Sequence, residues 1–312
     1  MRQVFSTVVC TVISLMLIVL SLRYVTDFWI LTFFYSLQLH IALGCIVVML
    51  LHLLLIRRHG YAFLLLAVSL FIAAHSLVML REPTGTAVPA EAAPVYKLMS
   101  FNILSENFEN GSHIADMIIA SGADVVYIFE AAPLETELAR ISAAYPYRIG
   151  CGAGTDTCDL LLLSRTPILQ QKVESLSDLR RDRFAMADIQ LGGQIVHFAA
   201  AHLSKPYFDD YHMEELRFVA KYLREVQGPL ILGGDFNSAS IAPDMQKFLR
   251  RSKLSTASME PATWPIVAGR AGIAIDHIYA RQPLALKSVN RIDDAYGSNH
   301  YGLTSEFVLN NR

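Results

Sequence analysis

The sequence of 312 residues is poor in charge, and its first quarter is almost free of it. Only 17% of the residues are charged, whereas 53% are hydrophobic. Val4–Leu22 lacks a charged residue for nineteen positions, and Phe28–Ile56 lacks one for twenty-nine. Water-soluble domains usually have about 25% charged residues and no such apolar runs, so this composition argues against a wholly soluble protein. It favours a chain that lies partly in a membrane.

The chain also lacks an excess of positive charge. Residues 1–81 contain five Lys and Arg and one Asp, which leaves 21 basic and 27 acidic residues and a formal net charge of −6 downstream. A domain that binds nucleic acid usually presents a basic surface to the phosphate backbone. Nucleic acid is therefore disfavoured as a partner, and a phosphate-binding site must supply its positive charge locally.

Cysteine is scarce too, with four in the chain. Cys10 and Cys45 lie in apolar runs, whereas Cys151 and Cys158 flank the short loop CGAGTDTC. In an oxidising compartment this loop could close as a disulfide, and the alternative is two unpaired thiols. We favour the disulfide.

Three apolar segments in residues 1–81 are long enough to cross a bilayer as helices. They are residues 4–22, 37–56 and 61–80. The aromatic stretch from Phe28 to Tyr35 has the character of a membrane interface. A cleaved signal peptide is the alternative for the first segment, but no clear A-x-A site follows and further apolar segments come next. We therefore predict a multi-pass membrane domain over residues 1–81.

The positive charges orient these helices. Arg57 and Arg58 lie in a short loop after the second segment and Arg2 precedes the first, so both sites are predicted to be cytoplasmic. After three crossings, the C-terminal domain is extracytoplasmic (periplasmic) at the inner, or plasma, membrane. Histidines within the apolar runs are either functional groups or, as we favour, neutral side chains packed between helices. They are His40, His52 and His75.

The composition changes after residue 81. Residues 82–96 are rich in Pro and Ala and lack apolar periodicity, which predicts an extended tether. In residues 97–312, strand-like runs alternate with helical patterns. The strands are expected at KLMSFNI, DVVYIFE, DLLLLSR, FAMADIQL, QIVHFAAAHL, PLILGGDFN, IDHIYA and LTSEFVL, and the helices near His113–Ser121, Leu134–Tyr145, Tyr211–Val226 and Pro243–Ser252. Many strands with few long helices indicate a layered α/β sandwich.

Polar residues stand at the ends of the predicted strands. Asn102 follows the run LMSF, and Glu130 ends the run VVYIF. A carboxylate there is costly unless it is solvated, paired or bound to a cation, and Mg²⁺ favours carboxylate oxygens. Glu130 is therefore the first candidate metal ligand, although such residues taken singly are more often solvated edges or turn formers.

The segment GGDFN after the run LIL adds Asp235 and Asn237. Two glycines permit a tight turn, and residues two apart project to the same side of an extended chain. The alternative is a strand-to-loop turn with Asx hydrogen bonds, and the segment taken alone favours neither interpretation. His202 ends another predicted strand, Asp276 follows the run IAI, and His300 precedes the last strand. With the candidate metal ligand, these side chains supply a metal, a proton acceptor and donors for phosphate oxygens, as hydrolysis of a phosphate ester requires.

The ordered set SFN, FE, HL, GGDFN, IDHI and SNH, over about Lys97–Arg312, resembles the endonuclease/exonuclease/phosphatase family, which includes DNase-I-like nucleases, sphingomyelinases and inositol-phosphate phosphatases. The resemblance implies a four-layer α/β/β/α sandwich. It also implies that Asn102 and Glu130 bind the metal, Mg²⁺ or alternatively Mn²⁺, and that Asp235 positions or deprotonates the attacking water.

The resemblance gives roles to four further residues. Asn237 would bind the phosphate oxygens, and His202 would stabilise the pentacovalent phosphate. His300 would contact the scissile phosphate, with Asp276 fixing its tautomer. His277, beside that acid, is assigned no role.

One departure concerns the final motif, which is usually Ser-Asp-His but here is Ser298-Asn299-His300. Asn299 can coordinate a metal through its carbonyl oxygen, but it brings no formal charge. We expect weaker metal affinity, or dependence on one ion rather than two.

Two other features have two interpretations each. Arg180, Arg181 and Arg183 form either a phosphate-binding rim or, as we favour, a solvated strand start. Trp264 either contacts substrate or anchors a packed loop.

The three apolar segments before the domain resemble the membrane-anchored branch of the family, including the VanJ-type glycopeptide-resistance proteins, which implies dephosphorylation of a polyprenyl pyrophosphate. A domain held at a membrane meets lipid head groups at high effective concentration. We expect a metal-dependent phosphohydrolase that has the lipid bilayer as its partner and acts on a lipid phosphate, pyrophosphate or phosphodiester. The alternatives are a membrane-tethered endonuclease or exonuclease and a non-catalytic binding or scaffold protein. No protein partner is predicted.

Overall fold

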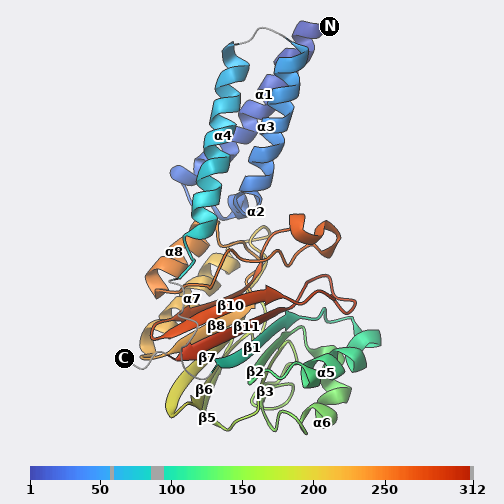
Figure 1. The fold of residues 1–312 in the computed structure, drawn as a ribbon, viewed down its shortest axis with the longest axis vertical. Coiled ribbons are helices and arrows are strands. Elements are labelled where there is room, and N and C mark those ends of the chain that lie inside the picture. Colours follow the sequence, from blue (N-terminus) through green and yellow to red (C-terminus); the bar gives the residue numbers. More distant parts are fainter. Residues whose placement is uncertain (57–59, 86–94, 310–312) are drawn as a thin grey trace.

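The computed structural model describes residues 1–56, 60–85 and 95–309. The predicted basic loop with Arg57 and Arg58, and residues 86–94 of the predicted tether, lie outside the described residues. A bundle of helices stands on a sandwich of two sheets (Figure 1).

The bundle contains three long apolar helices, α1 (Arg2–Ser21), α3 (Gln38–Leu55) and α4 (Gly60–Arg81). The turn η1 (Leu22–Tyr24) extends the first of them. Each is long and apolar enough to cross a membrane, with a mean hydropathy of 2.2 to 2.5. No more than 33% of each apolar window is buried inside the protein, so most of each helix is free to contact lipid. The three helices lie where the sequence predicts spans.

The N-terminus, the end of α3 and the start of α4 lie at the end of the bundle that is remote from the sandwich (Figure 1). The membrane histidines form hydrogen bonds between segments. Ser6 Oγ lies 3.3 Å from Nε2 of His52, and the Tyr24 hydroxyl lies 2.7 Å from Nδ1 of His75.

Two sheets form the sandwich. The first has the strand order β10-β11-β1-β2-β4-β3 and the second β5-β6-β7-β8-β9. The strands of the first are β10 (Leu284–Arg291), β11 (Leu303–Leu309), β1 (Val95–Asn102), β2 (Val125–Phe129), β4 (Leu160–Ser164) and β3 (Tyr147–Gly150). Those of the second are β5 (Ile168–Glu174), β6 (Phe184–Leu191), β7 (Gln194–His202), β8 (Leu230–Asp235) and β9 (Asp276–Arg281).

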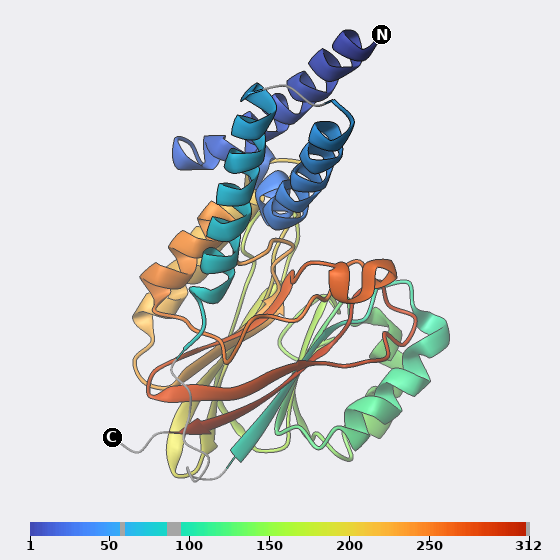
Figure 2. The same ribbon diagram turned by 45° about the horizontal axis from the view of Figure 1, so that its top comes forward.

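Helices cover the outer face of each sheet (Figure 2). The short helices η3 (Phe108–Asn110), α5 (Gly111–Ala120), η4 (Ala132–Glu137) and α6 (Leu138–Ile141) belong to the first sheet, and α7 (Tyr211–Glu225) and α8 (Pro243–Ser252) to the second. Alternate residues of each strand point to opposite faces. On β1, Leu98 faces the core between the sheets, whereas Met99 packs against α5. This confirms the predicted four-layer α/β/β/α sandwich.

Three strands are missing from the sequence prediction. β3 has four residues, and β5 is an edge strand whose residues are mostly exposed. β10 is also an edge strand, and a bulge at Lys287 interrupts its alternation. Each lacks the clear apolar period that marks a central strand.

The bundle is joined to the sandwich by a short aromatic segment and by α8. The segment consists of η2 (Trp29–Leu31) and α2 (Thr32–Ser36), between the first two membrane helices. Tyr35 is buried in the same apolar cluster as Phe248 of α8. Ser36 Oγ accepts a hydrogen bond of 3.1 Å from the backbone N–H of Ala239.

Arg23, at the end of the first candidate span, makes a second connection. Its guanidinium donates to the carbonyl of Ile241 at 2.9 Å and to Oε1 of Gln246 at 2.9 Å. It also donates to Oε1 of Gln38 at 2.6 Å. The buried charge thus links two of the candidate membrane spans to the start of α8.

The first residues of the predicted tether are bound to the sandwich. Gly85 donates its N–H to Thr256 O at 2.7 Å, and Glu82 accepts from Gln246 and Arg250 of α8.

Cys151 and Cys158 form a disulfide with Cα atoms 4.1 Å apart, in agreement with the interpretation we favoured.

Candidate active site

Strand pairing brings the predicted site residues to one edge of the sandwich. β1 and β2 are parallel, and Asn102 is paired with Phe129, so that Glu130 follows beside it. In the other sheet, His202 is paired with Asp235 across the parallel strands β7 and β8. Asp235 is paired in turn with Asp276, where the antiparallel β9 begins.

The glycines of GGDFN allow β8 to lie close to β7 in its own sheet and to β2 in the other sheet. Gly234 has φ of +155°, and a Cβ at this position would collide with the carbonyl oxygen of Ala201 on β7. A Cβ on Gly233 would lie 3.1 Å from the ring of Tyr127 in the other sheet. Asp235 is held at the end of β8 because side chains are absent from these two positions.

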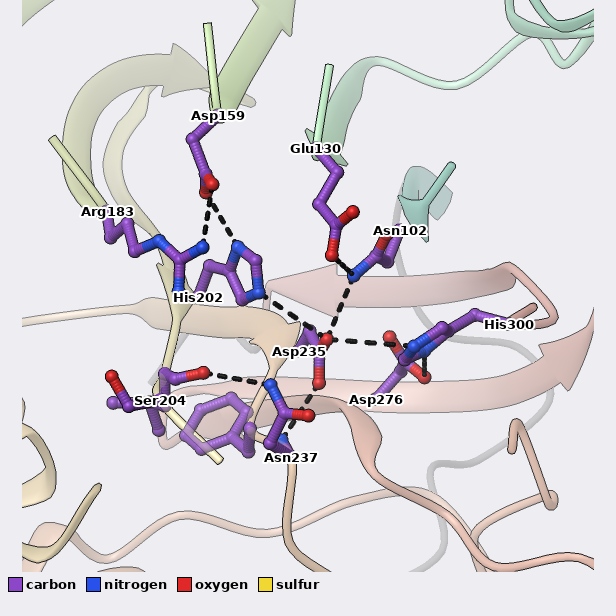
Figure 3. Close-up of polar contacts among 12 residues, drawn as sticks. Asn102, Glu130, Asp159, Arg183, His202, Ser204, Asp235, Asn237, Asp276 and His300 are labelled. Atoms are coloured by element: carbon purple, nitrogen blue, oxygen red, sulfur yellow. Dashed lines mark hydrogen bonds and ion pairs between the residues drawn. The ribbon is translucent and has the colours of Figure 1, made fainter. Parts of the chain in front are cut away.

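Asp235 is at the centre of the site (Figure 3). It is 1% exposed, its Oδ2 accepts from Nδ2 of Asn102 at 2.9 Å, and its Oδ1 accepts from the backbone N–H of Asn237 at 2.8 Å. Burial, and then the charge of Asp276, raise the pKa of Asp235 above its ordinary value, although His300 and His202 oppose this. A carboxylate with raised proton affinity is suited to accept a proton from water.

His300 and Asp276 form a buried pair on one side of Asp235. Nδ1 of His300 donates to Oδ2 of Asp276 at 2.8 Å, and Nε2 lies 3.9 Å from Oδ2 of Asp235. Burial lowers the pKa of His300, but the charges of Asp276 and Asp235 outweigh it and raise this pKa to about 9. The imidazole is therefore positively charged at neutral pH and can donate to a phosphate oxygen.

His202 lies on the other side of Asp235, with its Nε2 3.6 Å from Oδ2. Its Nδ1 donates to Oδ1 of Asp159 at 2.6 Å, and Nη2 of Arg183 donates to Oδ2 of the same carboxylate at 2.8 Å. Burial would raise the pKa of Asp159, but His202 and Arg183 outweigh burial and hold it well below its ordinary range. Asp159 is thus an ionised carboxylate that orients His202.

Asp159 and the role of Arg183 are missing from the sequence prediction. Asp159 directly precedes β4, which is antiparallel to β2, and Phe129 is paired with Leu160. The start of β4 therefore lies beside the end of β2. A strand-start acid could have been noted on the same grounds as Asp276. Arg183 is buried against Asp159, whereas Arg180 and Arg181 are exposed, so the solvated interpretation holds for only two of the three arginines.

Glu130 is half-buried and has a positive φ of 55°. It accepts hydrogen bonds from neutral groups: Nδ2 of Asn102 at 3.1 Å, and the backbone N–H and hydroxyl of Ser105 at 2.8 and 3.0 Å. Burial raises the pKa of Glu130, but these donors and the charge of His202 have the larger effect. The pKa therefore lies below its ordinary value, and the group is ionised. Unlike Asp159 and Asp276, which are bonded to basic side chains, Glu130 keeps its charge without a basic hydrogen-bond partner.

The donor set fits a hard divalent cation, because several carboxylates and amides converge with their charge incompletely balanced. Glu130 would hold such an ion. Asp235 lies near Glu130, because Asn102 donates hydrogen bonds to both carboxylates. The Asn102 amide presents its nitrogen to both carboxylates, while its oxygen accepts from the N–H of Leu104 at 3.0 Å. Asn299 is exposed and lines the same pocket.

Asp235, Asp276 and His300 also place one ligand atom each within 4.8 Å of one another. An ion bound by all three would compete with the hydrogen bond between Asp276 and His300. The bond between Asp276 and His300 therefore favours Glu130 as the principal carboxylate that would hold a cation.

The pocket over these residues includes Glu130, Asp235, Asn237 and His300. Trp264 lines it as well, which favours the substrate-contacting interpretation of this residue. His277 lies behind the pocket, where its Nδ1 is 2.5 Å from Glu260 and its Nε2 donates to Ser238 O at 2.8 Å. These bonds support a structural position.

The pocket also includes two residues from the membrane part of the chain, Phe33 and Ser36 of α2. Sequence reasoning missed both, because no local pattern tells which distant segment lies over a site. The signal available in the sequence was Phe33, an aromatic residue in the stretch from Phe28 to Tyr35 that has the character of a membrane interface.

Comparisons with known proteins agree with this geometry. Residues 99–300 match the model of the endonuclease/exonuclease/phosphatase family. No curated protein gives a significant sequence match. Similar solved structures include D. rerio TDP2 complexed with a single-strand DNA product, at 15% identity and a TM-score of 0.55, covering 69% of this chain and 99% of the other.

Two further similar structures act on or contain other molecules, according to their descriptions. Sphingomyelinase C from Streptomyces griseocarneus has 16% identity and a TM-score of 0.51, covering 69% of this chain and 99% of its own. Beta toxin from Staphylococcus aureus, with bound magnesium ions, has 16% identity and a TM-score of 0.52, covering 68% of this chain and 99% of its own. At this identity the likeness establishes the fold, while the matched family model covers more than half of the chain. The chain is therefore a member of the endonuclease/exonuclease/phosphatase family, whose members are hydrolases of phosphate esters.

Proposed function

We propose that this protein is a membrane-anchored, Mg²⁺-dependent phosphohydrolase that acts on a lipid phosphate, pyrophosphate or phosphodiester from the extracytoplasmic side. The observation that carries the proposal is the position of the catalytic edge. Phe33 and Ser36, which belong to the segment between the first two candidate membrane spans, line the same pocket as Asp235 and His300. A phosphate bound there is next to the membrane helices.

The attachment of the catalytic domain supports the proposal. Arg23, Ser36 and His40 each form hydrogen bonds between the membrane part and the sandwich. Nε2 of His40 donates to the carbonyl of Ala271 at 2.9 Å, which fixes the loop after Trp264. These bonds hold the pocket against the helical bundle, which supports a site that faces the bilayer in which the bundle would lie.

Charge supports the same substrate class over nucleic acid. The domain has a formal net charge of −6 downstream of residue 81. Lys205 is the only Lys or Arg that lines the pocket in the described part of the chain. A duplex requires several phosphate contacts from basic groups, whereas a single lipid head group needs few.

Each side chain has a separate role in the proposed reaction. Asp235 accepts a proton from the attacking water, and His202 and His300 donate to the phosphate oxygens as charge develops. Asn237 uses one amide hydrogen for Leu203 O at 2.9 Å and retains the other for phosphate. A divalent ion at Glu130 supplies Lewis-acid polarisation of the phosphoryl group when bound.

The orientation of the membrane part supports the proposed topology. The N-terminus, the end of α3 and the start of α4 are at the end remote from the catalytic domain (Figure 1). The positive-inside rule assigns that end to the cytoplasm, because Arg2 begins α1 there and Arg57 follows the end of α3 in the sequence.

The test is release of phosphate from a long-chain polyprenyl pyrophosphate by the purified full-length protein, with Mg²⁺ and with EDTA, beside cleavage of plasmid DNA. Glu130→Ala removes the principal carboxylate, and Glu135→Ala, an exposed acid nearby, is the matched control. We expect Mg²⁺-dependent release that is lost in Glu130→Ala and retained in Glu135→Ala. DNA nicking lost in Glu130→Ala, without release from the lipid, would instead establish a tethered nuclease.

A further inference from the structure

The pocket combines polar residues that suit a phosphate with apolar residues that a phosphate does not need. Its apolar members are Phe33, Pro206, Tyr207, Trp264, Ile273 and Ile275. Burial of apolar surface is favourable only against another apolar surface, so a purely inorganic or sugar phosphate would leave these side chains without a partner.

The aromatic members come from three separate parts of the chain. Phe33 belongs to α2 in the membrane part, and its ring meets the ring of Tyr207 edge to face with centroids 5.7 Å apart. Tyr207 in turn lies against Phe208, with centroids 4.7 Å apart. Phe33 and Tyr207 are 37% and 38% exposed, and Phe208 is 72% exposed. The rings therefore form an accessible apolar surface that runs from the pocket to the outside.

This surface lies at the level where the membrane helices meet the catalytic domain (Figure 1). Aromatic side chains favour the boundary between hydrocarbon and water. The positions of the walls are fixed, since Ser36 is bonded to Ala239, and His40 is bonded to Ala271 in the loop η5 (Ile266–Ala271) after Trp264.

Resting on the proposed function, we propose that Phe33, Tyr207 and Trp264 form a lateral passage that holds the hydrocarbon chain of the substrate while its phosphate occupies the metal site. The membrane part of the protein is then a substrate-selecting wall as well as an anchor. The occupant is a long-chain lipid phosphate that enters from the outer leaflet of the bilayer.

The test compares two substrates with the same pyrophosphate group, a long-chain polyprenyl pyrophosphate and the short-chain, water-soluble isopentenyl pyrophosphate. Both are given to the full-length protein in phospholipid vesicles, and kcat/KM is measured by phosphate release. Phe33→Ala should lower kcat/KM for the long chain by about tenfold, the effect of losing one favourable aromatic contact. The value for the short chain should stay within about twofold of that of the parent protein.

Two further variants separate the passage from general damage. Phe63→Ala removes a more exposed aromatic ring, 61% against 37% for Phe33, from α4, which does not line the pocket in the described residues, and it should change neither value. Tyr207→Ala lies outside the membrane helices and should reproduce the selective loss if Phe33→Ala does not fold. Phe33→Leu should restore most of the long-chain activity, since it keeps the apolar surface.

An equal loss on both substrates, or no loss on either, would overturn the passage while leaving the proposed phosphohydrolase intact. Absence of release from both substrates by the parent protein would instead overturn the proposed function. Cleavage of a single-stranded oligonucleotide that Phe33→Ala weakens would assign the rings to base stacking and overturn both.

Discussion

Replacement of Asp159 by Asn tests whether His202 depends on a carboxylate that the sequence motifs do not include. The carboxylate accepts from two N–H donors, Nη2 of Arg183 at 2.8 Å and Nδ1 of His202 at 2.6 Å. An amide has one acceptor oxygen and one donor nitrogen, so it can satisfy Arg183 or His202 but not both. If its oxygen remains with Arg183, its nitrogen meets Nδ1 of His202, which then cannot carry a proton, so the ring can no longer donate from both of its nitrogens.

The magnitude follows from the lost bond. A hydrogen bond to a charged group contributes about 1.5–3 kcal/mol, which corresponds to about a 10- to 150-fold loss in kcat/KM if the bond strengthens the transition state. Because the substrate can still bind through the remaining groups, we expect kcat to account for most of the loss.

The assay is phosphate release from polyprenyl pyrophosphate at saturating Mg²⁺, with the thermal stability of each variant measured beside it. Asp156→Asn is the matched control, since Asp156 lies on the exposed loop and contacts exposed Arg181 at 3.5 Å. Asp159→Glu keeps the charge and should retain more activity than Asp159→Asn. The reasoning is refuted if Asp159→Asn stays within twofold of the parent protein, or if Asp156→Asn loses as much.

Three other changes give distinct expectations. Asn299→Asp should lower the Mg²⁺ concentration for half-maximal activity several-fold by adding a charge beside the metal site, as followed by Mg²⁺ titration; Asn290→Asp, exposed on β10, should not change it. Gly234→Ala should abolish activity or folding, because its Cβ collides with a backbone carbonyl, whereas Gly44→Ala, with open space around it, should have little effect on either activity or circular dichroism. Arg23→Met should destabilise the contact between the helical bundle and the sandwich by about 2–3 kcal/mol, because Ile241 O and Gln246 Oε1 would lose their buried donor. Faster limited proteolysis between the two parts would reveal this loss.

Much of the fold and the site could be predicted from the sequence because the relevant patterns are local. Most of the apolar runs beside the catalytic residues are strands, and the polar ends of the parallel pairs β1–β2 and β7–β8 meet at one edge because parallel strands share an end. Asp235 and Asn237 lie in the pocket as the GGDFN spacing predicts. The helix Tyr211–Glu225 was predicted within one residue because its apolar period is strong.

The remaining features depend on contacts between distant segments. Asp159 becomes a neighbour of His202 only through the antiparallel pairing of β4 with β2. Phe33 reaches the pocket because α2 packs against the sandwich, and no periodicity in either segment encodes that contact. The polar edge strand β5 was missed because its residues face water, which removes the apolar signal.

On the proposed function, the hydrogen bonds of Arg23, Ser36 and His40 hold the catalytic domain at one height above the lipid. An active site held in this way samples the leaflet in two dimensions, so its turnover depends on the mole fraction of substrate in that leaflet rather than on the bulk concentration. Adding inert phospholipid to the same vesicles should therefore slow the reaction by surface dilution even when the total amount of substrate is constant. The proposed anchoring also confines the enzyme to the membrane in which its helices lie.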